Sequence, residues 1–211
     1  IRVHLLLTDR LSCPRCGPSF GLILLAHDLR NRIVKAGTLG CPNCRDSFSI
    51  EDGFADLRAP PRGPLPPGLA GPPGSEDPEV AARVMALLGI VAGPGAVALV
   101  GEPARLAREV AATLSEVQVV AVDPDMRRWD EVAGVSRIAA GPGLPFFSAA
   151  LRAAAVDGRL GRAVLAEAVR VVAPRGRLVV LHAPDWTELL LRDAGLSVLA
   201  AEAGTVVVAR G

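Results

Sequence analysis

All four cysteines of this 211-residue chain lie in two matched pairs, Cys13-Pro14-Arg15-Cys16 and Cys41-Pro42-Asn43-Cys44. A hairpin easily spans the 24 residues between the pairs, so both can converge on one tetrahedral ion that is bound by four thiolates. Disulfides or free thiols are the alternative, although a chain with a sizeable core of its own does not need disulfides. We predict a structural Zn²⁺ bound by Cys13, Cys16, Cys41 and Cys44. Because such a site has no open position, the metal organises the fold rather than activating water.

The charge balance and the apolar pattern limit the kinds of partner. Lys and Arg total 23 against 22 Asp and Glu, so no strong field attracts nucleic acid or an anionic membrane. Five Phe, two Trp and no Tyr give little material for a base-stacking surface. No apolar run approaches the roughly 20 residues of a membrane helix, and we expect the short run at 21–26 to be a buried strand. These features predict a cytoplasmic protein, and leave peripheral association with a membrane complex open.

A proline-rich segment divides the chain. Residues 59–78 hold eight of the eighteen prolines and four glycines. Such a composition cannot pack a core and favours a semi-extended tether. We therefore predict a cysteine-bearing module of short strands at 1–58, a Pro/Gly-rich linker at 59–78 and a second domain at 79–211.

Strand-like and helix-like segments alternate through the second domain. Asp77-Pro78 predicts a helix start. One face of that helix would carry Val80, Val84, Leu87, Leu88 and Val91. We then predict strands at 96–100, 117–122, 136–139, 153–156 and 177–182, helices at 104–114, 126–132, 160–172 and 186–193, and a final hairpin of 197–202 with 205–210. This order predicts an α/β fold with a doubly wound, mostly parallel sheet and an antiparallel pair at one edge.

Four local sequences of the second domain carry a family resemblance. They are a strand with a terminal acid at 119–125, an "LPF" element at 143–146, a helix-to-strand passage at 165–178 and a turn at 191–196. Over about 115 residues the domain resembles the class I S-adenosylmethionine-dependent methyltransferases. The resemblance implies a Rossmann-like sheet with the cofactor at its strand ends.

The cysteine-bearing module has a resemblance of its own. Residues 11–16, 37–44 and 48–57 are similar to the small zinc-ribbon activator family that partners tRNA, rRNA and release-factor methyltransferases, and the similarity covers nearly all of 5–58. It implies a four-cysteine zinc ribbon whose partner is a methyltransferase.

The cofactor site of the second domain departs from its family pattern. Of the glycine-rich turn after the first strand only Gly101 is present, and Glu102 and Pro103 stand where small residues should admit the methionine moiety. The position of the acid expected near the end of that strand falls at apolar Leu99, or at Ala98 if the register slips by one residue. Asp123 is at the right distance to bind ribose hydroxyls, or it is only a turn residue at a strand end. The acid that should precede the "LPF" element and hold the adenine is missing from 140–143, and Asp157-Gly158 is expected to be a turn.

No catalytic residue can be nominated from the remaining polar side chains. His4 and His27 lie in the ribbon module, as packing or solvated side chains or as spare metal ligands. His182 ends a strand at the edge where sites of this fold gather, and is either a ligand or a structural histidine. Trp129 and Trp186 are expected to anchor a core or an interface.

The broken glycine turn and the intact metal site favour a non-catalytic scaffold or accessory subunit that binds protein partners. The cofactors implied are Zn²⁺ and, only at Gly101 and Asp123, a vestigial S-adenosylmethionine site. The alternative is an active S-adenosylmethionine-dependent methyltransferase that carries its activator module in cis. A nucleic-acid-binding ribbon protein is a third hypothesis, which the balanced charge disfavours.

Overall fold

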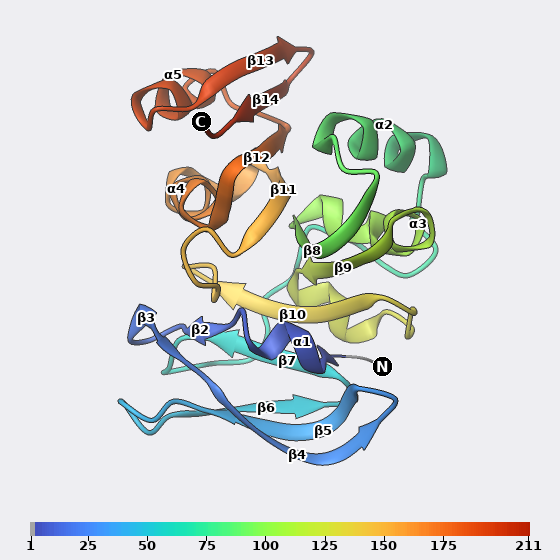
Figure 1. Ribbon diagram of the computed structural model, residues 1–211, viewed down its shortest axis with the longest axis vertical. Coiled ribbons are helices and arrows are strands. Elements are labelled where there is room, and N and C mark those ends of the chain that lie inside the picture. Colours follow the sequence, from blue (N-terminus) through green and yellow to red (C-terminus); the bar gives the residue numbers. More distant parts are fainter. Residues whose placement is uncertain (1–2) are drawn as a thin grey trace.

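One mixed sheet runs the length of the molecule in the computed structural model, which describes residues 3–211 and the side chains from Leu7 onward (Figure 1). Its strand order is β1-β5-β6-β7-β10-β9-β8-β11-β12-β14-β13, with β4 paired to β5. Five strands of the N-terminal module, β1 and β4 to β7, form one end of this sheet and the C-terminal hairpin forms the other, whereas β2 and β3 pair in a separate two-stranded sheet (Figure 1).

The elements of the N-terminal module are short and mostly extended, as predicted. They are β1 (Val3–His4), α1 (Leu5–Thr8), β2 (Ser12–Cys13), β3 (Gly17–Gly21), β4 (Ile23–Arg30), β5 (Ile33–Gly40), β6 (Ser47–Glu51) and β7 (Phe54–Arg58).

The elements of the second domain alternate, as predicted. They are α2 (Pro78–Leu88), β8 (Ala92–Val100), η1 (Glu102–Leu106), α3 (Ala107–Thr113), β9 (Ser115–Val122), η2 (Pro124–Arg128), β10 (Val135–Gly141), β11 (Leu151–Asp157), η3 (Gly158–Leu160), α4 (Arg162–Val171), β12 (Val172–Leu181), α5 (Thr187–Asp193), β13 (Ser197–Glu202) and β14 (Thr205–Ala209). No helix of the described residues has both the length and the apolarity needed to cross a membrane.

The parallel part of the sheet has the doubly wound arrangement. Counted from β8, the order β10-β9-β8-β11-β12 is third, second, first, fourth and fifth, and all four pairings are parallel. β14 pairs antiparallel with β12 and with β13. The predicted mixed α/β architecture, with its closing hairpin, is therefore confirmed.

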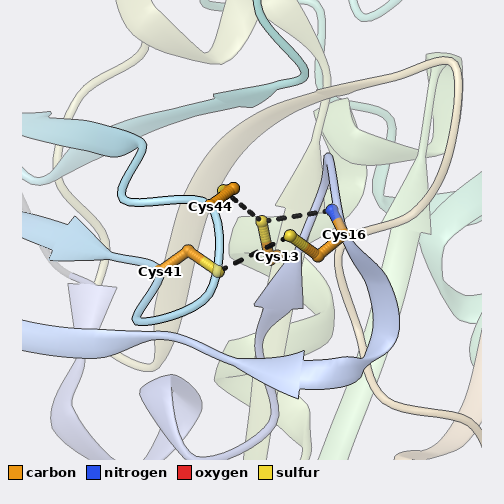
Figure 2. A group of neighbouring side chains, drawn as sticks. All are labelled: Cys13, Cys16, Cys41 and Cys44. Atoms are coloured by element: carbon orange, nitrogen blue, oxygen red, sulfur yellow. Dashed lines mark hydrogen bonds between the residues drawn. The ribbon is translucent and has the colours of Figure 1, made fainter.

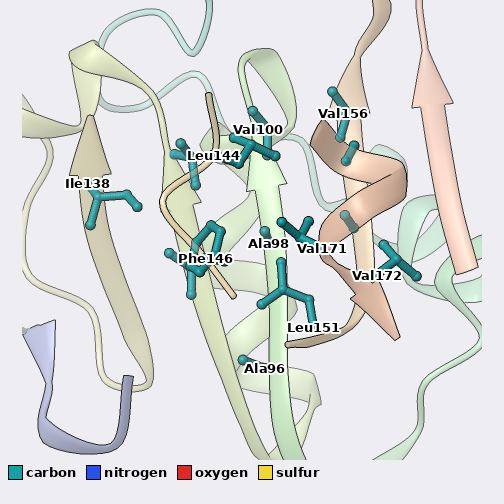
Figure 3. Close-up of a cluster of buried hydrophobic side chains, with 14 of the residues drawn as sticks. Ala96, Ala98, Val100, Ile138, Leu144, Phe146, Leu151, Val156, Val171 and Val172 are labelled. Carbon is teal, nitrogen blue, oxygen red and sulfur yellow. The ribbon is translucent and has the colours of Figure 1, made fainter. Parts of the chain in front are cut away.

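Helices cover both faces of this parallel sheet, so its central strands are buried on both sides. Ala96, Ala98 and Val100 of β8 pack in one cluster with Val171 of α4, as Figure 3 shows. The intervening residues of β8 pack in a second cluster with α2 and α3. This two-sided burial explains why the strands are nearly continuous apolar runs.

Helix α2 begins where the sequence predicted. The Asp77 carboxylate accepts hydrogen bonds from the amides of Glu79 and Val80, at 3.1 and 3.2 Å. The helix ends earlier than the apolar spacing suggested, because Gly89 takes a left-handed conformation with a φ of 66°. Val91 is consequently 84% exposed, so its predicted place on the buried face is wrong.

The sheet is continuous between the two modules, although we predicted a boundary between them after residue 58. β7 pairs in parallel with β10, from Phe54 opposite Arg137 to Arg58 opposite Gly141. A second junction joins residues 10–12 to the "LPF" element, where the Ser12 amide donates to the Pro145 carbonyl at 2.9 Å. The ribbon module and the second domain are thus held together by backbone pairing as well as by residues 59–78.

Residues 59–77 contain no helix or strand, in keeping with the semi-extended tether that their composition predicted, but they also pack against the second domain. Ala70 is 1% exposed, and Leu65 packs against the same buried cluster as α2 and α3. The amides of Leu69 and Gly71 donate to side chains of the second domain. Proline and glycine rule out a side-chain core in this segment, but they leave backbone amides and carbonyls that can bind a neighbouring surface.

The apolar run at 21–26 is not a buried strand. It leads into β4, which pairs only with β5 among the described residues. Ile23 and Leu25 are each 64% exposed, whereas Leu24 and Ala26 are half-buried. The sheet has a packed layer on one side only at this end, so alternate side chains of the run face solvent.

Candidate metal centre and cofactor-type site

The four cysteine side chains meet in one cluster, as Figure 2 shows. The Sγ atoms of Cys13 and Cys44 are 3.7 Å apart, those of Cys16 and Cys41 are 3.8 Å apart, and all four lie within 4.8 Å of one another. A tetrahedron with Zn–S bonds of about 2.3 Å has edges of about 3.8 Å. A disulfide needs a separation of about 2.05 Å, so the cluster has the dimensions of a four-thiolate metal site and not of a disulfide pair.

Contacts around the sulfur atoms hold the two turns in place. The Cys16 amide donates to the Cys13 Sγ at 3.4 Å, and the Asn43 side-chain amide donates to the Cys16 Sγ at 3.3 Å. An ion pair of 2.9 Å between Arg15 and Asp46 links one turn to the other. Such outer contacts orient metal ligands and stabilise their thiolate form.

The crowding of the thiols favours a bound cation. The thiols drive one another's pKa values apart: the backbone of Asp46 lowers the pKa of Cys44, but burial and the neighbouring cysteines raise it to about 12, whereas burial raises the pKa of Cys41 but hydrogen bonds from the backbone and from the neighbouring cysteines lower it to about 7. Four thiolates at these distances repel one another unless a positive ion lies between them. The donor set therefore fits zinc, which would have a structural role there because no position is left open.

Of the two histidines of the ribbon module, only His27 has a side chain that the structure describes, and it does not join this cluster. His27 lies on β4 with an exposed side chain and is not among the grouped ligands. The side chain of His4 lies outside the described residues.

Gly101 and Asp123, the two residues predicted for the cofactor, come together at the carboxyl edge of the sheet. Gly101 follows β8 with a φ of 76°, and Asp123 follows β9. Both line one hollow of about 60 Å³, together with Gly141, Pro142 and Leu144. Small-molecule sites enclose about 300–1,000 Å³, so this hollow has room for one or two waters and not for a nucleoside.

The carboxylate of Asp123 is 3% exposed and already bound by backbone amides. Its Oδ1 accepts from the Asp125 amide at 2.8 Å, and its Oδ2 accepts from the Leu69 amide at 2.9 Å. Burial raises the pKa of Asp123 even though these amides lower it. Asp123 thus caps the turn at η2, as the turn alternative predicted, and it also holds the proline-rich segment.

Glu102 lies in a network of charged groups beside the same hollow. It accepts from His182 Nε2 at 2.6 Å and from Arg105 at 2.9 Å, and it is also paired with Arg159. Arg159 reaches Asp157 as well, at 2.7 Å. Arginines thus neutralise the Glu102 carboxylate, and the network occupies the position where the resemblance implied small residues.

Asp157 caps the turn that was predicted at Asp157-Gly158, because its Oδ1 accepts from the Arg159 amide at 2.9 Å at the start of η3. Its side chain is fully buried at the end of β11 and accepts hydrogen bonds from the backbone and the guanidinium of Arg159. Glu102, Asp157 and His182 are close enough to share a metal ion, but Arg159 already supplies the counter-charge. Sequence reasoning missed this grouping, although an acid directly after a buried strand was the available signal.

The remaining single residues have packing or structural contacts. His182 is 45% exposed on its side chain and is held by Glu102. Trp129 is 7% exposed, and its indole donates to the Gly71 carbonyl at 3.0 Å. Trp186 packs under the guanidinium of Arg162, with 4.3 Å between the guanidinium carbon and the ring centre.

No family model and no curated protein matches the sequence. Among solved structures, the chain is similar to precorrin-6Y C5,15-methyltransferase from Geobacter metallireducens, with 14% identity and a TM-score of 0.48 over 63% of this chain and 88% of that one. A candidate S-adenosyl-L-methionine-dependent methyltransferase from Methanococcus maripaludis has 14% identity and a TM-score of 0.45, over 63% and 84%. Precorrin 8W decarboxylase from Methanobacterium thermoautotrophicum has 18% identity and a TM-score of 0.42, over 68% and 97%. Such distant likenesses carry no argument about activity, and the methyltransferase-like character of the domain rests on its strand order and motifs.

Proposed function

We propose that this chain is a non-catalytic, zinc-stabilised protein whose methyltransferase-like domain does not use S-adenosylmethionine. The observation that carries the proposal is the hollow at Gly101 and Asp123, which has only about 60 Å³ where a nucleoside would need several times that volume. The charged network around Glu102 occupies the neighbouring region, where the family resemblance would place the methionine part of the cofactor. A domain that keeps the fold but not the space for its cofactor is best explained as a structural part.

The N-terminal module acts in this proposal as a zinc ribbon that stiffens the end of the sheet. The resemblance implies that such a ribbon partners a methyltransferase. The pairing of β7 with β10 supports the view that its partner is the methyltransferase-like domain of the same chain. We also propose that the ribbon module ends at residue 58, that the second domain begins after residue 78, and that the protein is cytoplasmic.

A protein partner is the second part of the proposal. It is supported by four large apolar side chains that are exposed on neighbouring strands β3 and β4, namely Phe20, Ile23, Leu25 and Leu29. Grouped exposed apolar side chains are typical of surfaces that contact other proteins. A net charge of +1 gives nucleic acid little attraction.

The second candidate is an active methyltransferase with its activator in cis. The specific observation in its favour is that Gly101 and Asp123 still face one hollow, at the strand ends where the fold would bind the cofactor. Under this hypothesis the proline-rich segment moves away when the cofactor enters.

Calorimetric titration of the purified full chain with S-adenosylmethionine, and separately with S-adenosylhomocysteine, distinguishes the two candidates. The non-catalytic proposal predicts no saturable heat at micromolar concentrations. Micromolar binding that is lost in Asp123→Ala would establish the second candidate instead.

A further inference from the structure

We propose that residues 65–75, here called the strap, are an internal ligand of the ribose position in the methyltransferase-like domain. The Leu69 amide of the strap donates to the same carboxylate that would accept the hydroxyls of a bound ribose. The inference rests on the proposed function and deepens it, because it gives a physical reason why the Asp123 carboxylate is not available to a nucleoside.

The hydrogen bonds at Asp123 show this substitution directly. The Leu69 amide donates to Asp123 Oδ2 at 2.9 Å. An acid at the end of the second strand of a doubly wound fold binds ribose through hydroxyl donors. Because a buried carboxylate needs such donors, strap amides and ribose hydroxyls are alternatives for the same oxygens.

The second acid of the turn is also bound by the strap. The Gly71 amide donates to Asp125 Oδ2 at 3.1 Å, and the Gly71 carbonyl accepts from the Trp129 indole at 3.0 Å. Within the strap, Ser75 Oγ donates to the Pro72 carbonyl at 2.8 Å. The strap is therefore fixed on both sides and has a defined shape.

The close approach at Gly68 leaves no room for a ligand between the strap and Asp123. A Cβ atom at position 68 would lie 1.8 Å from Asp123 Oδ1 and 2.9 Å from the Asp125 carboxyl carbon. Only glycine can occupy this position without moving the backbone or the carboxylate. The strap must leave before a nucleoside can enter.

Two glycines of the proline-rich segment provide a matched pair of variants in the full chain. Gly68→Ala introduces the clash at Asp123, whereas a Cβ atom at Gly63 meets nothing within 4 Å. Hydrogen exchange followed by mass spectrometry measures whether the amides of the strap are protected. Adenosine, added in a calorimetric titration, probes the ribose position.

We expect hydrogen exchange in the strap to be at least tenfold faster in Gly68→Ala than in the wild type, while β8, β9 and β11 stay protected. We also expect this variant to bind adenosine at least tenfold more tightly than the wild type. Gly63→Ala should match the wild type in both measurements. Asp123→Asn, which keeps the shape but turns one acceptor into a donor, should also speed exchange at Leu69, and it serves if Gly68→Ala does not fold.

Two results would overturn the inference. One is a strap that stays protected in Gly68→Ala or, if that variant does not fold, in Asp123→Asn. The other is a strap released by Gly68→Ala without any gain in adenosine binding. Micromolar binding of S-adenosylmethionine to the wild type would instead contradict the proposed function, whatever the strap does in the variants.

Discussion

Removal of the metal should unfold the ribbon end of the sheet and leave the parallel part intact. Cys13 and Cys41 are 1% and 3% exposed and lie in the same buried cluster as Phe48. The cysteine turns follow β2 and β5, so the metal joins segments that are 25 residues apart or more in sequence. Without the ion, the four thiols lose the charge that would bind them to one centre, and only the outer contacts of Asn43 and of Arg15 with Asp46 link the two turns.

The expected loss of stability on metal removal follows from the small size of the ribbon module. A segment of about 60 residues buries only about 60% of its unfolded surface and is marginally stable alone. Structural zinc contributes about 10 kcal/mol or more in small domains, whereas whole domains are stable by about 5–15 kcal/mol. The stabilising free energy lost with the metal should therefore exceed the free energy that packing of β4, β5 and β6 contributes, so these strands should unfold. β7 should stay folded, because it pairs with β10.

Three measurements on the same samples test this prediction. Cys41→Ser should abolish bound zinc. Asn43→Ala, which removes only the hydrogen bond to Cys16, should weaken zinc binding by about 10- to 100-fold. Hydrogen exchange of the chelated protein should show fast exchange in β5 and β6 and slow exchange in β8 and β11. Chelated protein that still protects β5 and β6, or a Cys41→Ser variant that keeps its zinc, would refute the reasoning.

Three further predictions concern the second domain. Arg170 lowers the pKa of Glu167 by a hydrogen bond, so Glu167 contributes stability that is fully present above its ordinary pKa and is lost as the pH falls through the lowered value. In urea unfolding, Glu167→Gln should cost about 1 kcal/mol at pH 7 and progressively less as the pH falls below the ordinary pKa of a glutamate, and a cost that does not change with pH would contradict this. Phe146→Ala should cost about 3–5 kcal/mol in the same assay, because Phe146 is fully buried in the cluster of Figure 3; a cost below about 1 kcal/mol would mean that the site repacks. Arg137→Met should lower the free energy of unfolding by about 2 kcal/mol, because the buried guanidinium donates to backbone carbonyls that include that of Asp52 in the ribbon module. An unchanged unfolding midpoint would show that Arg137 does not stabilise the junction between the two modules.

The architecture of the second domain could be predicted because its signals are local. A capping acid before a proline sets the start of α2, and the short apolar runs 96–100, 153–156 and 178–181 mark the buried parts of β8, β11 and β12. The cysteine spacing likewise predicted which four side chains would meet. Gly101 and Asp123 were placed at one site because the fold brings successive strand ends to the same edge.

What the sequence did not reveal depends on contacts between distant segments. The strap binds through main-chain groups, which every sequence has, so its composition could not show where its amides donate. The pairing of β7 with β10 depends on an edge strand that no local pattern marks. The burial of Asp157 depends on Arg159 and on a network that also includes Glu102 and His182.

Native mass spectrometry of the purified full chain, sprayed with excess S-adenosylmethionine, tests the central claim most directly. A closed cofactor site beside an intact cysteine cluster predicts one species, the polypeptide with a single zinc ion and no nucleoside. A species that carries both zinc and S-adenosylmethionine would contradict the non-catalytic account, and a folded chain without zinc would contradict the metal centre.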